Sequence, residues 1–480
     1  MNKINDTNKD KSIIDTTDNF LLASDYILSH QEGQKWYRTK MIDKRTWNEI
    51  LISYELFNIL KKCDGSCSIS EFQPWEIEIL KSLVNQGIVV KIHRDYQLMN
   101  NNHIKKGLYK LPRYIEGVII HITGRCNLRC KHCYFSYFDD TNELRTDEWE
   151  NVFEQLHELG VYKIQITGGE PLCREDLIDI LKFCKKYCFL TAITTNATLL
   201  DEDILSEILK AGVNAFGCSL DGASSETYKD FRGKDLFQKV LDNLMLLKEY
   251  RDRKKLAYFS ISSMLTKRTI KELFKLYKVI IYEIKPNVWG VERPYISGRY
   301  KKYFKDYYIP VEKTAPYLHH LLLQIEKDLP RYPYRIQLDK YWTWLNPNIY
   351  GHVNLSEVYA PYTLNDSMCG RHFQHLYILP NGDVTWCDYK EACPEPIGNV
   401  KKKPIIEIWN IMEKLKKDMI LRNAQCKDCN YLKYCGGGCR LIPVLKGDGL
   451  FGCDTDFKYY IEYGIRMGLY NRIIESKEVR

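Results

Sequence analysis

The chain has 480 residues, 45% of them hydrophobic, which is enough for two or three domains with cores of their own. No apolar run approaches the roughly 18 residues of a membrane span, and the polar N-terminus lacks the apolar stretch of a secretory signal. The net charge of +8 is spread along the chain, so a nucleic-acid partner is not expected. We therefore expect a cytoplasmic protein without a membrane partner, in which 17 cysteines point to metal or catalytic chemistry more than to disulfides.

The N-terminal part is predicted to hold a disordered tail over 1–20 and a small α+β domain over 21–105. Helix and turn signals give its internal order. The expected elements are two strands around a turn at Asp43-Lys44, a helix over 54–63 capped by Ser53 and ended by a turn at Asp64-Gly65, a helix over 74–86 between Pro74 and Gly87, and an edge strand or wing over 87–92. Residues 101–115 read as a linker.

Residues 106–310 are predicted to form an α/β core, because strands and helical segments alternate from residue 116 onward. The expected strands cover residues 117–123, 162–167, 189–195, 215–220, 257–264 and 285–290. Helical periodicity follows each of the first five strands. The pattern thus predicts five βα units and a sixth strand in a parallel sheet, open or curled into part of a barrel. Residues 311–365 show no clear period and are treated as a bridging region.

Four unusual stretches follow the first four of these strands. They are CNLRCKHC at 126–133, GGEP at 168–171, TTNAT at 194–198 and SLDG at 219–222. Each is a weak signal by itself, since such residues also make ordinary turns. Because the carboxyl ends of parallel strands share one rim, the four together predict a site at that rim.

The cysteines form two groups that suit metal binding. Cys126, Cys130 and Cys133 lie on the loop that leaves the first strand, and three thiolates leave one position of a metal site open. Eight more cysteines occupy residues 369–453, too densely for chance core packing. Four-thiolate zinc sites are the plain alternative for this second group. The triad with its open position favours iron–sulfur clusters.

The C-x3-C-x2-C loop at Cys126, Cys130 and Cys133 resembles the cluster loop of radical S-adenosylmethionine (SAM) enzymes, and residues 116–310 resemble their core. The resemblance implies a partial (β/α)6 TIM barrel and a 4Fe–4S cluster whose fourth iron binds the amino and carboxylate groups of SAM. It implies that one electron, from a reductant such as flavodoxin or ferredoxin, cleaves SAM to methionine and a 5′-deoxyadenosyl radical. That radical then abstracts a hydrogen from the substrate.

The same resemblance implies contacts to SAM. The residues are Gly168, Gly169 and Glu170 for its amino group, and Thr195, Asn196, Ser219 and Arg232 for its ribose and carboxylate. The chemistry agrees in outline, because glycine lets backbone approach a ligand, a carboxylate pairs with an ammonium, and arginine binds a carboxylate through two hydrogen bonds. The chain departs from the family at Ala197, where the family often has glycine.

The region over 366–480 resembles the SPASM extension of this superfamily, whose pattern is C-x9–15-G-x4-C, then C-x2-C-x5-C-x3-C, then a final cysteine. The resemblance implies two auxiliary 4Fe–4S clusters, and so three clusters in all. The implied ligands are Cys369, Cys387 and Cys439 for auxiliary cluster I, and Cys426, Cys429, Cys435 and Cys453 for auxiliary cluster II.

Auxiliary cluster I has three ligands in this scheme. Either one iron stays open, which is the favoured interpretation because it resembles related peptide maturases, or a residue such as Cys393 or Asp388 completes the site. An open iron would bind a substrate thiolate and lower its pKa. The remaining cysteines lack spacing partners and are read as core or incidental residues: Cys63, Cys67, Cys173, Cys184, Cys188 and Cys218.

The domain over 21–105 resembles the PqqD-like element that binds the leader segment of ribosomally made precursor peptides, through SYELFNILKKCDGSCSISEF and EIEILKSLVNQGIVV. Such elements take the peptide as an added strand at a sheet edge. A winged helix with a packing role is the alternative. As a whole the chain resembles a radical SAM/SPASM peptide maturase of the thioether-forming (sactipeptide or ranthipeptide) type, which implies a precursor peptide as partner.

Other functions fit the same architecture. Related enzymes make carbon–carbon or carbon–oxygen crosslinks, and the anaerobic sulfatase-maturing enzymes make formylglycine with a base at the position of Asp388. Asp388 is therefore the candidate catalytic base, with a solvated or capping carboxylate as the alternative. A zinc-stapled peptide-binding scaffold is the non-enzymatic alternative.

Overall fold

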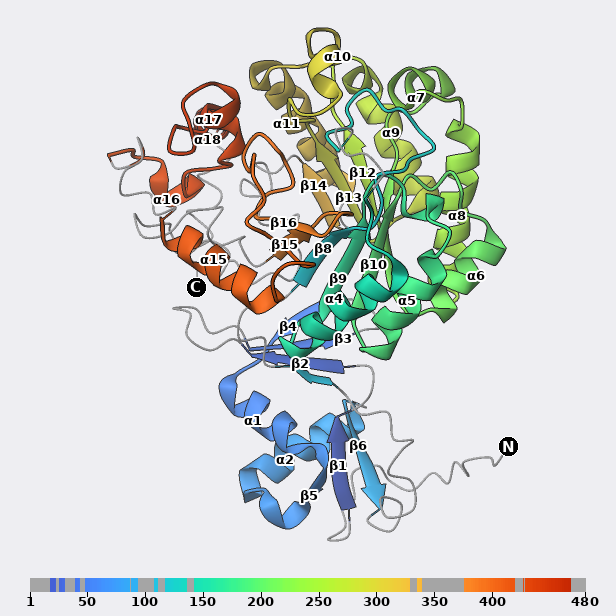
Figure 1. Ribbon diagram of the computed structural model, residues 1–480, viewed down its shortest axis with the longest axis vertical. Coiled ribbons are helices and arrows are strands. Elements are labelled where there is room, and N and C mark those ends of the chain that lie inside the picture. Colours follow the sequence, from blue (N-terminus) through green and yellow to red (C-terminus); the bar gives the residue numbers. More distant parts are fainter. Residues whose placement is uncertain are drawn as a thin grey trace. The chain divides into compact units, whose positions relative to one another are not determined.

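The structure is a computed structural model, and its contacts divide the chain into two units (Figure 1). The first unit comprises residues 1–114 with 159–162, and the second comprises residues 115–158 with 163–480. The structure describes residues 18–22, 26–30, 39–43, 48–86, 88–93, 108–110, 117–135, 142–328, 335–338, 375–418, 426 and 428–467. In these ranges no helix is both long and apolar enough to cross a membrane.

The first unit contains two small sheets and two helices. Its elements are β1 (Asp18–Leu22), β2 (Tyr26–His30), β3 (Thr39–Asp43), β4 (Asn48–Leu51), α1 (Tyr54–Lys62), β5 (Asp64–Ser68), the 3₁₀ turn Ile69–Glu71, α2 (Pro74–Asn85), β6 (Val89–His93) and β7 (Leu108–Lys110). The sheet orders are β5-β1-β6 and β4-β3-β2-β7. Phe57 and Leu60 from α1 and Leu80 from α2 fill a shared core with Met41 and Val89.

The structure confirms the predicted β3–β4 pair, both helices and the strand after them. It also confirms the helix cap, because the Ser53 hydroxyl accepts a hydrogen bond from Leu56 N at 3.1 Å. Gly87 lies outside the described residues. Four strands were not predicted: β1 begins inside the predicted tail, β2 precedes the predicted strand pair, β5 replaces a turn, and β7 lies in the predicted linker. Each is short and forms by pairing with a distant strand, β1 with β5 and β6 and β7 with β2, so local pattern could not reveal it.

The second unit is built on alternating strands and helices. Its elements up to residue 292 are β8 (Gly117–His121), α4 (Thr146–Glu158), β9 (Lys163–Thr167), α5 (Leu177–Lys186), β10 (Leu190–Thr195), α6 (Glu202–Lys210), β11 (Val213–Ser219), α7 (Ser225–Arg232), α8 (Phe237–Asp252), β12 (Tyr258–Met264), α9 (Leu273–Lys278) and β13 (Val288–Glu292). The six strands pair in parallel, which confirms the expected α/β core and its partial barrel of βα units.

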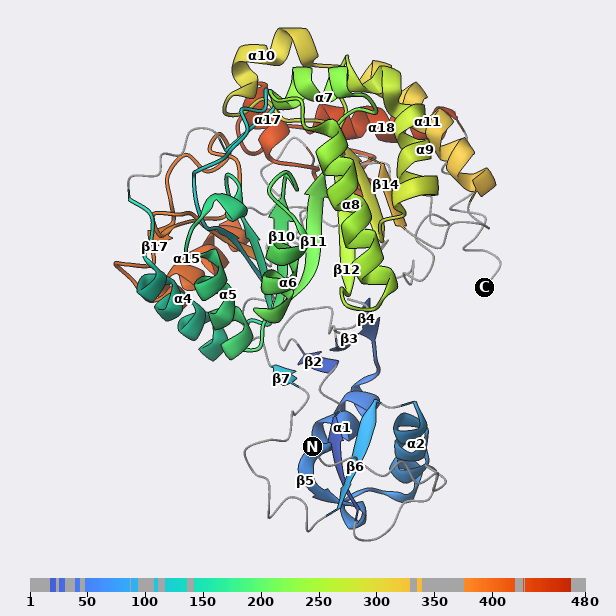
Figure 2. The same ribbon diagram turned by 90° about the vertical axis from the view of Figure 1, so that its right-hand side faces the viewer.

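Helices cover the outer face of this curved sheet, and Figure 2 shows α6 and α8 running along β10 to β12. Their inner faces are apolar at helical spacing. On α4, Trp149, Val152, Phe153 and Leu156 are buried, and each such side chain contributes about 1.5–3 kcal/mol by leaving water. At the carboxyl end of the sheet, the strands are followed by loops.

The sheet continues beyond the six strands. The elements from residue 293 onward are α10 (Tyr300–Tyr307), α11 (Val311–Asp328), β14 (Arg335–Leu338), β15 (His375–Ile378), β16 (Asp383–Thr385), β17 (Gly398–Asn399), α15 (Ile405–Asp418), α16 (Leu432–Cys435), α17 (Leu441–Leu445) and α18 (Thr455–Arg466). β14 extends one edge beside β13, and β15 pairs in parallel with β8 at the other. The expected hairpin is confirmed as β15–β16, with Gly382 at a φ of 87° in its turn.

The bridging region is more regular than predicted, since it includes α11 and β14. Pro316 inside α11 obscured the helix signal, because proline removes a backbone donor and usually ends a helix. The apolar spacing was nevertheless present, and Leu318, Leu321, Leu322 and Ile325 are all buried. Residues 339–374, which include Cys369, lie outside the described ranges.

Candidate active site

The first site is the loop between β8 and α4 that carries Cys126, Cys130 and Cys133. The three thiols lie close enough for the charge of each to act on its neighbours. Burial raises the pKa of all three, that of Cys126 to about 12. Three enclosed thiols, gathered at the end of a parallel strand, suit a metal cluster that would stabilise their thiolates.

Neighbouring segments hold this loop in place through its backbone. Arg299 donates from its backbone N to Cys133 O at 2.9 Å and from its guanidinium to Cys130 O at 3.1 Å. Gly298 packs so tightly here that a Cβ would stand 2.4 Å from Tyr134 O. Lys131 N donates to Phe231 O at 3.0 Å. The cysteine loop is therefore fixed from several sides.

The GGEP stretch joins β9 to the same loop. Gly169 N donates to Thr123 O and Glu170 N donates to Arg125 O, both at 2.7 Å. A Cβ on Gly168 would stand 2.4 Å from Thr123 O, and a Cβ on Gly169 would stand 2.1 Å from Arg125 O. The close approach of two protein loops thus requires glycine at both positions, and the contact of these glycines with SAM stays a prediction.

Glu170 lies inside the site with 1% of its surface exposed. Its carboxylate accepts hydrogen bonds from Thr195 Oγ1 at 2.6 Å, Asn196 N at 2.7 Å and Leu172 N at 3.2 Å. Burial raises the pKa of this carboxyl, although these hydrogen bonds act in the opposite direction. A cationic group next to Glu170 would compensate for its burial, so the residue fits the ammonium of an amino-acid ligand.

The TTNAT stretch braces the cysteine loop from β10. Asn196 Nδ2 donates to Asn127 Oδ1 at 2.9 Å, and Asn127 Nδ2 donates to Thr198 Oγ1 at 2.8 Å. Ala197 has a φ of 61°, in the left-handed region that favours glycine. Position 197 therefore has the backbone conformation that favours glycine, the residue that the resembled family often has there.

Ser219 ends β11 and Arg232 ends α7. Arg232 is buried against Asp221, with Nη2 at 2.5 Å and Nε at 2.6 Å from Oδ2, and its Nη1 lies 3.8 Å from Cys130 Sγ. The guanidinium thus already has a carboxylate, and its remaining edge faces a sulfur. A cation in that position is suited to the negative charge of a thiolate cluster.

Asp388 joins the C-terminal hairpin to the cysteine loop. Its Oδ1 lies 2.5 Å from His121 Nε2, and its Oδ2 accepts a hydrogen bond from Tyr134 OH at 2.7 Å. Burial and the charge of Asp388 raise the pKa of Tyr134 well above its usual range, so the phenol remains a donor. Because Cys387 precedes Asp388 and Cys133 precedes Tyr134, this contact links the two predicted cluster regions.

Tyr389 continues this junction. Its ring lies 4.9 Å from that of Tyr134 and 5.1 Å from that of Tyr295, centroid to centroid. Burial raises its pKa, and the charges of Asp388, Cys387 and Cys439 act in the same direction. Cys387 and Cys439 are 52 positions apart in the sequence, and both are therefore near one tyrosine. Their predicted partner Cys369 lies outside the described residues.

The thiols of Cys426, Cys429, Cys435 and Cys453 form the other C-terminal group. Charges at Cys426 and Cys429 act on both Cys435 and Cys453. Arg440 lies beside them, since its charge acts on Cys426. It is 2% exposed, and its Nε and Nη2 have no hydrogen-bond partner among the described residues. A buried cation with two unused donors fits an anionic thiolate cluster.

In the described ranges, no three Cys, His, Asp or Glu side chains are arranged to hold a single metal ion. In a 4Fe–4S cluster each cysteine sulfur binds a different iron atom. The sulfur atoms therefore lie farther apart than the ligands of a single metal ion.

Sequence reasoning missed several residues of this region, among them His121, Tyr389 and Arg440, and treated Tyr134 as structural. His121 stood within an apolar strand, and its stacking on Phe135 at 4.2 Å follows from the fold. A histidine within an otherwise apolar strand is the sequence signal that could have identified His121 as a candidate. Arg440 directly follows the last cysteine of a spaced motif, which is a comparable signal.

Comparison with known proteins supports this description. Residues 120–280 match the Radical SAM superfamily, and residues 369–430 match SPASM, an iron-sulfur cluster-binding domain. The chain therefore has a radical SAM domain, which implies SAM and a 4Fe–4S cluster, and a SPASM domain, which implies further clusters.

Relatives of known sequence include the AdoMet-dependent heme synthase of Methanosarcina barkeri, 25% identical over 346 residues that cover 68% of this chain and 91% of that protein. The PqqA peptide cyclase of Bradyrhizobium diazoefficiens is 37% identical over 108 residues, which are 22% of this chain and 28% of the cyclase.

Two solved structures share the fold. Streptococcus suis SuiB, bound to its precursor peptide SuiA, has a TM-score of 0.62 at 18% identity and covers 90% of this chain and 98% of its own. Native anSMEcpe, with AdoMet and the Cp18Cys peptide, has a TM-score of 0.59 at 18% identity. The match covers 76% of this chain and 99% of anSMEcpe.

Proposed function

We propose that the protein is a radical SAM/SPASM enzyme that oxidatively crosslinks a ribosomally made precursor peptide, joining a cysteine sulfur to a carbon as a thioether. The observation that carries this proposal is the Asp388 junction, because it ties the loop of Cys133 to the segment of Cys387. Chemistry started at the first loop would thus take place beside a second group of thiols.

The proposed cofactor set is SAM and three 4Fe–4S clusters. Cys126, Cys130 and Cys133 would hold the first cluster, and Glu170 would receive the SAM ammonium, with the other SAM-contact residues named above around it. When bound, SAM and the first cluster together supply an oxidant that removes one hydrogen atom from an unactivated carbon. The chain positions the substrate and keeps water away.

The reaction balances if an auxiliary cluster held by the second group of thiols accepts one electron. The peptide loses a hydrogen atom from carbon, a proton from sulfur and one electron as the carbon–sulfur bond forms. The 5′-deoxyadenosyl radical would take the hydrogen atom, the C-terminal cysteines would hold the auxiliary cluster that accepts the electron, and a base would accept the proton. Asp388 is the proposed base, since it lies between both regions and its side chain is 20% exposed.

The N-terminal unit is the proposed leader-binding part. Each of its two small sheets has two edge strands, β4 and β7 in one and β5 and β6 in the other, at which a peptide can be added as a further strand. SuiB, which was solved with a precursor peptide, covers 90% of this chain, whereas the heme synthase alignment covers 68%. The proposal of a peptide substrate is supported by the likeness of fold to two structures solved with bound peptides.

Two related outcomes share these features. Carbon–carbon or carbon–oxygen crosslinking would use the same oxidation without a sulfur. Formylglycine formation would use Asp388 as the base on an oxidised cysteine or serine carbon, and it is supported by the likeness of fold to anSMEcpe.

The test is mass spectrometry of the candidate peptide after anaerobic incubation with the enzyme, SAM and a reductant. Loss of two hydrogens per event with cysteines that no longer alkylate supports the thioether, and the same loss with free thiols means another crosslink. Cys126→Ala is the control and should give neither product nor SAM cleavage. SAM cleavage without any change in the peptide would refute the peptide substrate, and protein that holds zinc but no iron would refute the enzyme.

A further inference from the structure

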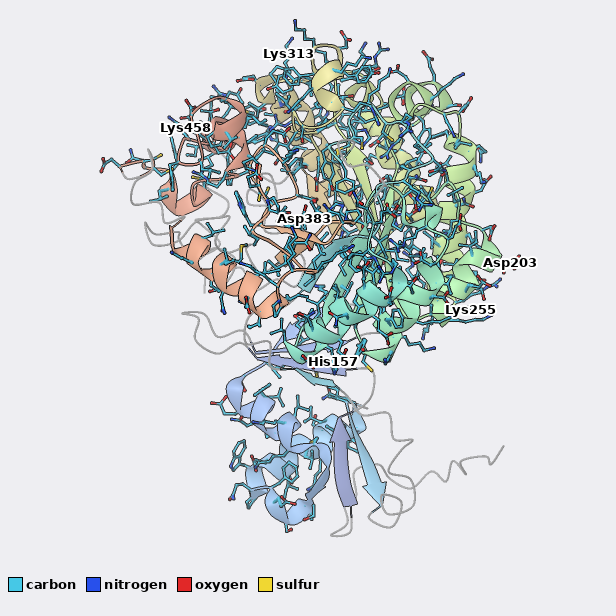
Figure 3. The ribbon with its side chains drawn as sticks, viewed as in Figure 1. His157, Asp203, Lys255, Lys313, Asp383 and Lys458 are labelled. Atoms are coloured by element: carbon cyan, nitrogen blue, oxygen red, sulfur yellow. The ribbon has the colours of Figure 1, made fainter. Side chains whose placement is uncertain are left out.

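The β15–β16 hairpin and the segment after it line an open cavity of about 340 Å³. Cys387 and Cys393 both line it, together with Asp383, Thr385 and Lys390. Figure 3 marks Asp383 on the hairpin. The cavity thus receives two thiols from one short segment, and one of them is a predicted ligand of auxiliary cluster I.

The wall made by β16 is polar where a closed core would be apolar. Asp383 and Thr385 are two residues apart on β16, so their side chains point to the same side of the strand, and Cys387, two residues past the end of β16, lines the same cavity. Thr385 is 7% exposed, and its Oγ1 has no hydrogen-bond partner among the described residues. A buried hydroxyl without a partner, on the wall of a cavity beside two thiols, indicates a bound group there.

Cys393 is a buried thiol beside the backbone of the Cys387 segment. It is 4% exposed, and its Sγ lies 3.2 Å from Glu395 O. The backbone N–H groups of Trp386 and Cys387 lie against the same thiol. Backbone N–H groups directed at sulfur are a common second shell of iron–sulfur thiolates, because they stabilise the negative charge. The segment between the two cysteines therefore folds back on itself.

The other candidate for the fourth position is already engaged. Both oxygens of Asp388 are used, one by His121 at 2.5 Å and the other by Tyr134 at 2.7 Å. Those partners lie at the end of β8 and on the cysteine loop. Asp388 would have to break both contacts to reach a metal beside Cys387.

We propose that Cys393 is the fourth thiolate ligand of auxiliary cluster I, next to Cys369, Cys387 and Cys439. This rests on the proposed function, because it assumes that the cluster forms. The thiol of Cys393 releases a proton when it binds iron, and no electron is exchanged. The cluster is then closed, which replaces the open iron favoured from sequence. A closed cluster accepts electrons but does not dock the substrate thiolate.

The experiment removes the first cluster and compares ligands of the others. In a Cys126→Ala, Cys130→Ala, Cys133→Ala background, the two auxiliary clusters should give about eight irons per chain. Cys393→Ala and the near-isosteric Cys393→Ser are made in this background. Cys184→Ala is the matched control, since Cys184 is a buried cysteine without a predicted ligand role.

The readout is the electron paramagnetic resonance spectrum of the reduced clusters, with and without added 2-mercaptoethanol. We expect the Cys393 variants to lose iron or to show a spectrum that changes when the thiol is added, while the background and Cys184→Ala do not change. A background spectrum that itself responds to the thiol, or Cys393 variants identical to it, would overturn the proposal. A background with about four irons or none would instead refute the two auxiliary clusters.

Discussion

The buried Asp221–Arg232 pair allows a prediction about how the cysteine loop is stabilised. The Asp221 side chain is fully buried, the Arg232 side chain is 7% exposed, and the two are 2.5 Å apart. Asp221→Asn keeps the shape and retains an oxygen for Met264 N, which Asp221 Oδ1 now accepts at 2.5 Å. The substitution removes the charge that compensates the guanidinium.

Removing one partner of a buried ion pair costs about 3–5 kcal/mol. An arginine cannot lose its proton, whereas a buried carboxyl can take one up. Burial already raises the pKa of Asp221. We therefore expect Asp221→Asn to cost about 3 kcal/mol, or roughly 4 °C in Tm for a unit of this size, and Arg232→Met to cost less. The double variant Asp221→Asn, Arg232→Met should recover part of the loss, because neither member of the pair is left as an uncompensated charge.

The assay is anaerobic thermal unfolding of the cluster-loaded protein followed by tryptophan fluorescence. Asp242→Asn is the control, since Asp242 is an exposed residue on α8 and should change stability by no more than about 0.5 kcal/mol. The description of the pair would be wrong if the stability loss of the double variant equalled the sum of the two single losses. It would also be wrong if Arg232→Met lost more stability than Asp221→Asn.

Three further predictions concern single side chains. Glu170→Gln should weaken SAM binding at least tenfold, about 1.4 kcal/mol, with unchanged iron content, as measured by anaerobic calorimetry; unchanged affinity would contradict the ammonium contact. Burial raises the pKa of Cys184 to about 12, so at pH 8 and at pH 9.5 it stays a protonated thiol. Iodoacetamide should then label the exposed Cys188 but not Cys184 until the protein unfolds, as peptide mapping will show. Arg440→Met should lower the reduction potential of auxiliary cluster II by roughly 90 mV, because a nearby unit charge at an effective dielectric of about 20 contributes about 2 kcal/mol; a redox titration that finds no shift would place Arg440 away from the cluster.

The sheet could be predicted because its signals are local. β8 to β13 each have an apolar run, and a helical period follows most of them, so their positions differ from prediction by a few residues. β7 and β14 could not be found in this way. β7 has three residues and exists because β2 pairs with it, about 80 positions earlier in the chain.

The site was predictable as far as spacing determines it. Cysteine intervals and the stretches at strand ends were visible, and the structure places Cys126, Glu170 and Asn196 around one loop. Their partners were not visible. The contact of Asp388 with His121 spans 267 positions, and only the pairing of β15 with β8 brings them together. Likewise the close approach at Gly168 depends on where two loops meet.

Closure of auxiliary cluster I by Cys393 would change how the substrate sulfur is activated. An open iron would bind the thiolate and lower its pKa, so no base would be needed for that step. A closed cluster leaves the proton of the substrate thiol to a side chain, and Asp388 is the carboxylate placed between the two regions. Tyr134 donates to that carboxylate and His121 lies against its other oxygen, so it is held in place before a peptide arrives. Thioether formation and formylglycine formation would then need the same base. Substitution of Asp388 should therefore slow either reaction, and the mass of the product, rather than the loss of rate, is what separates them.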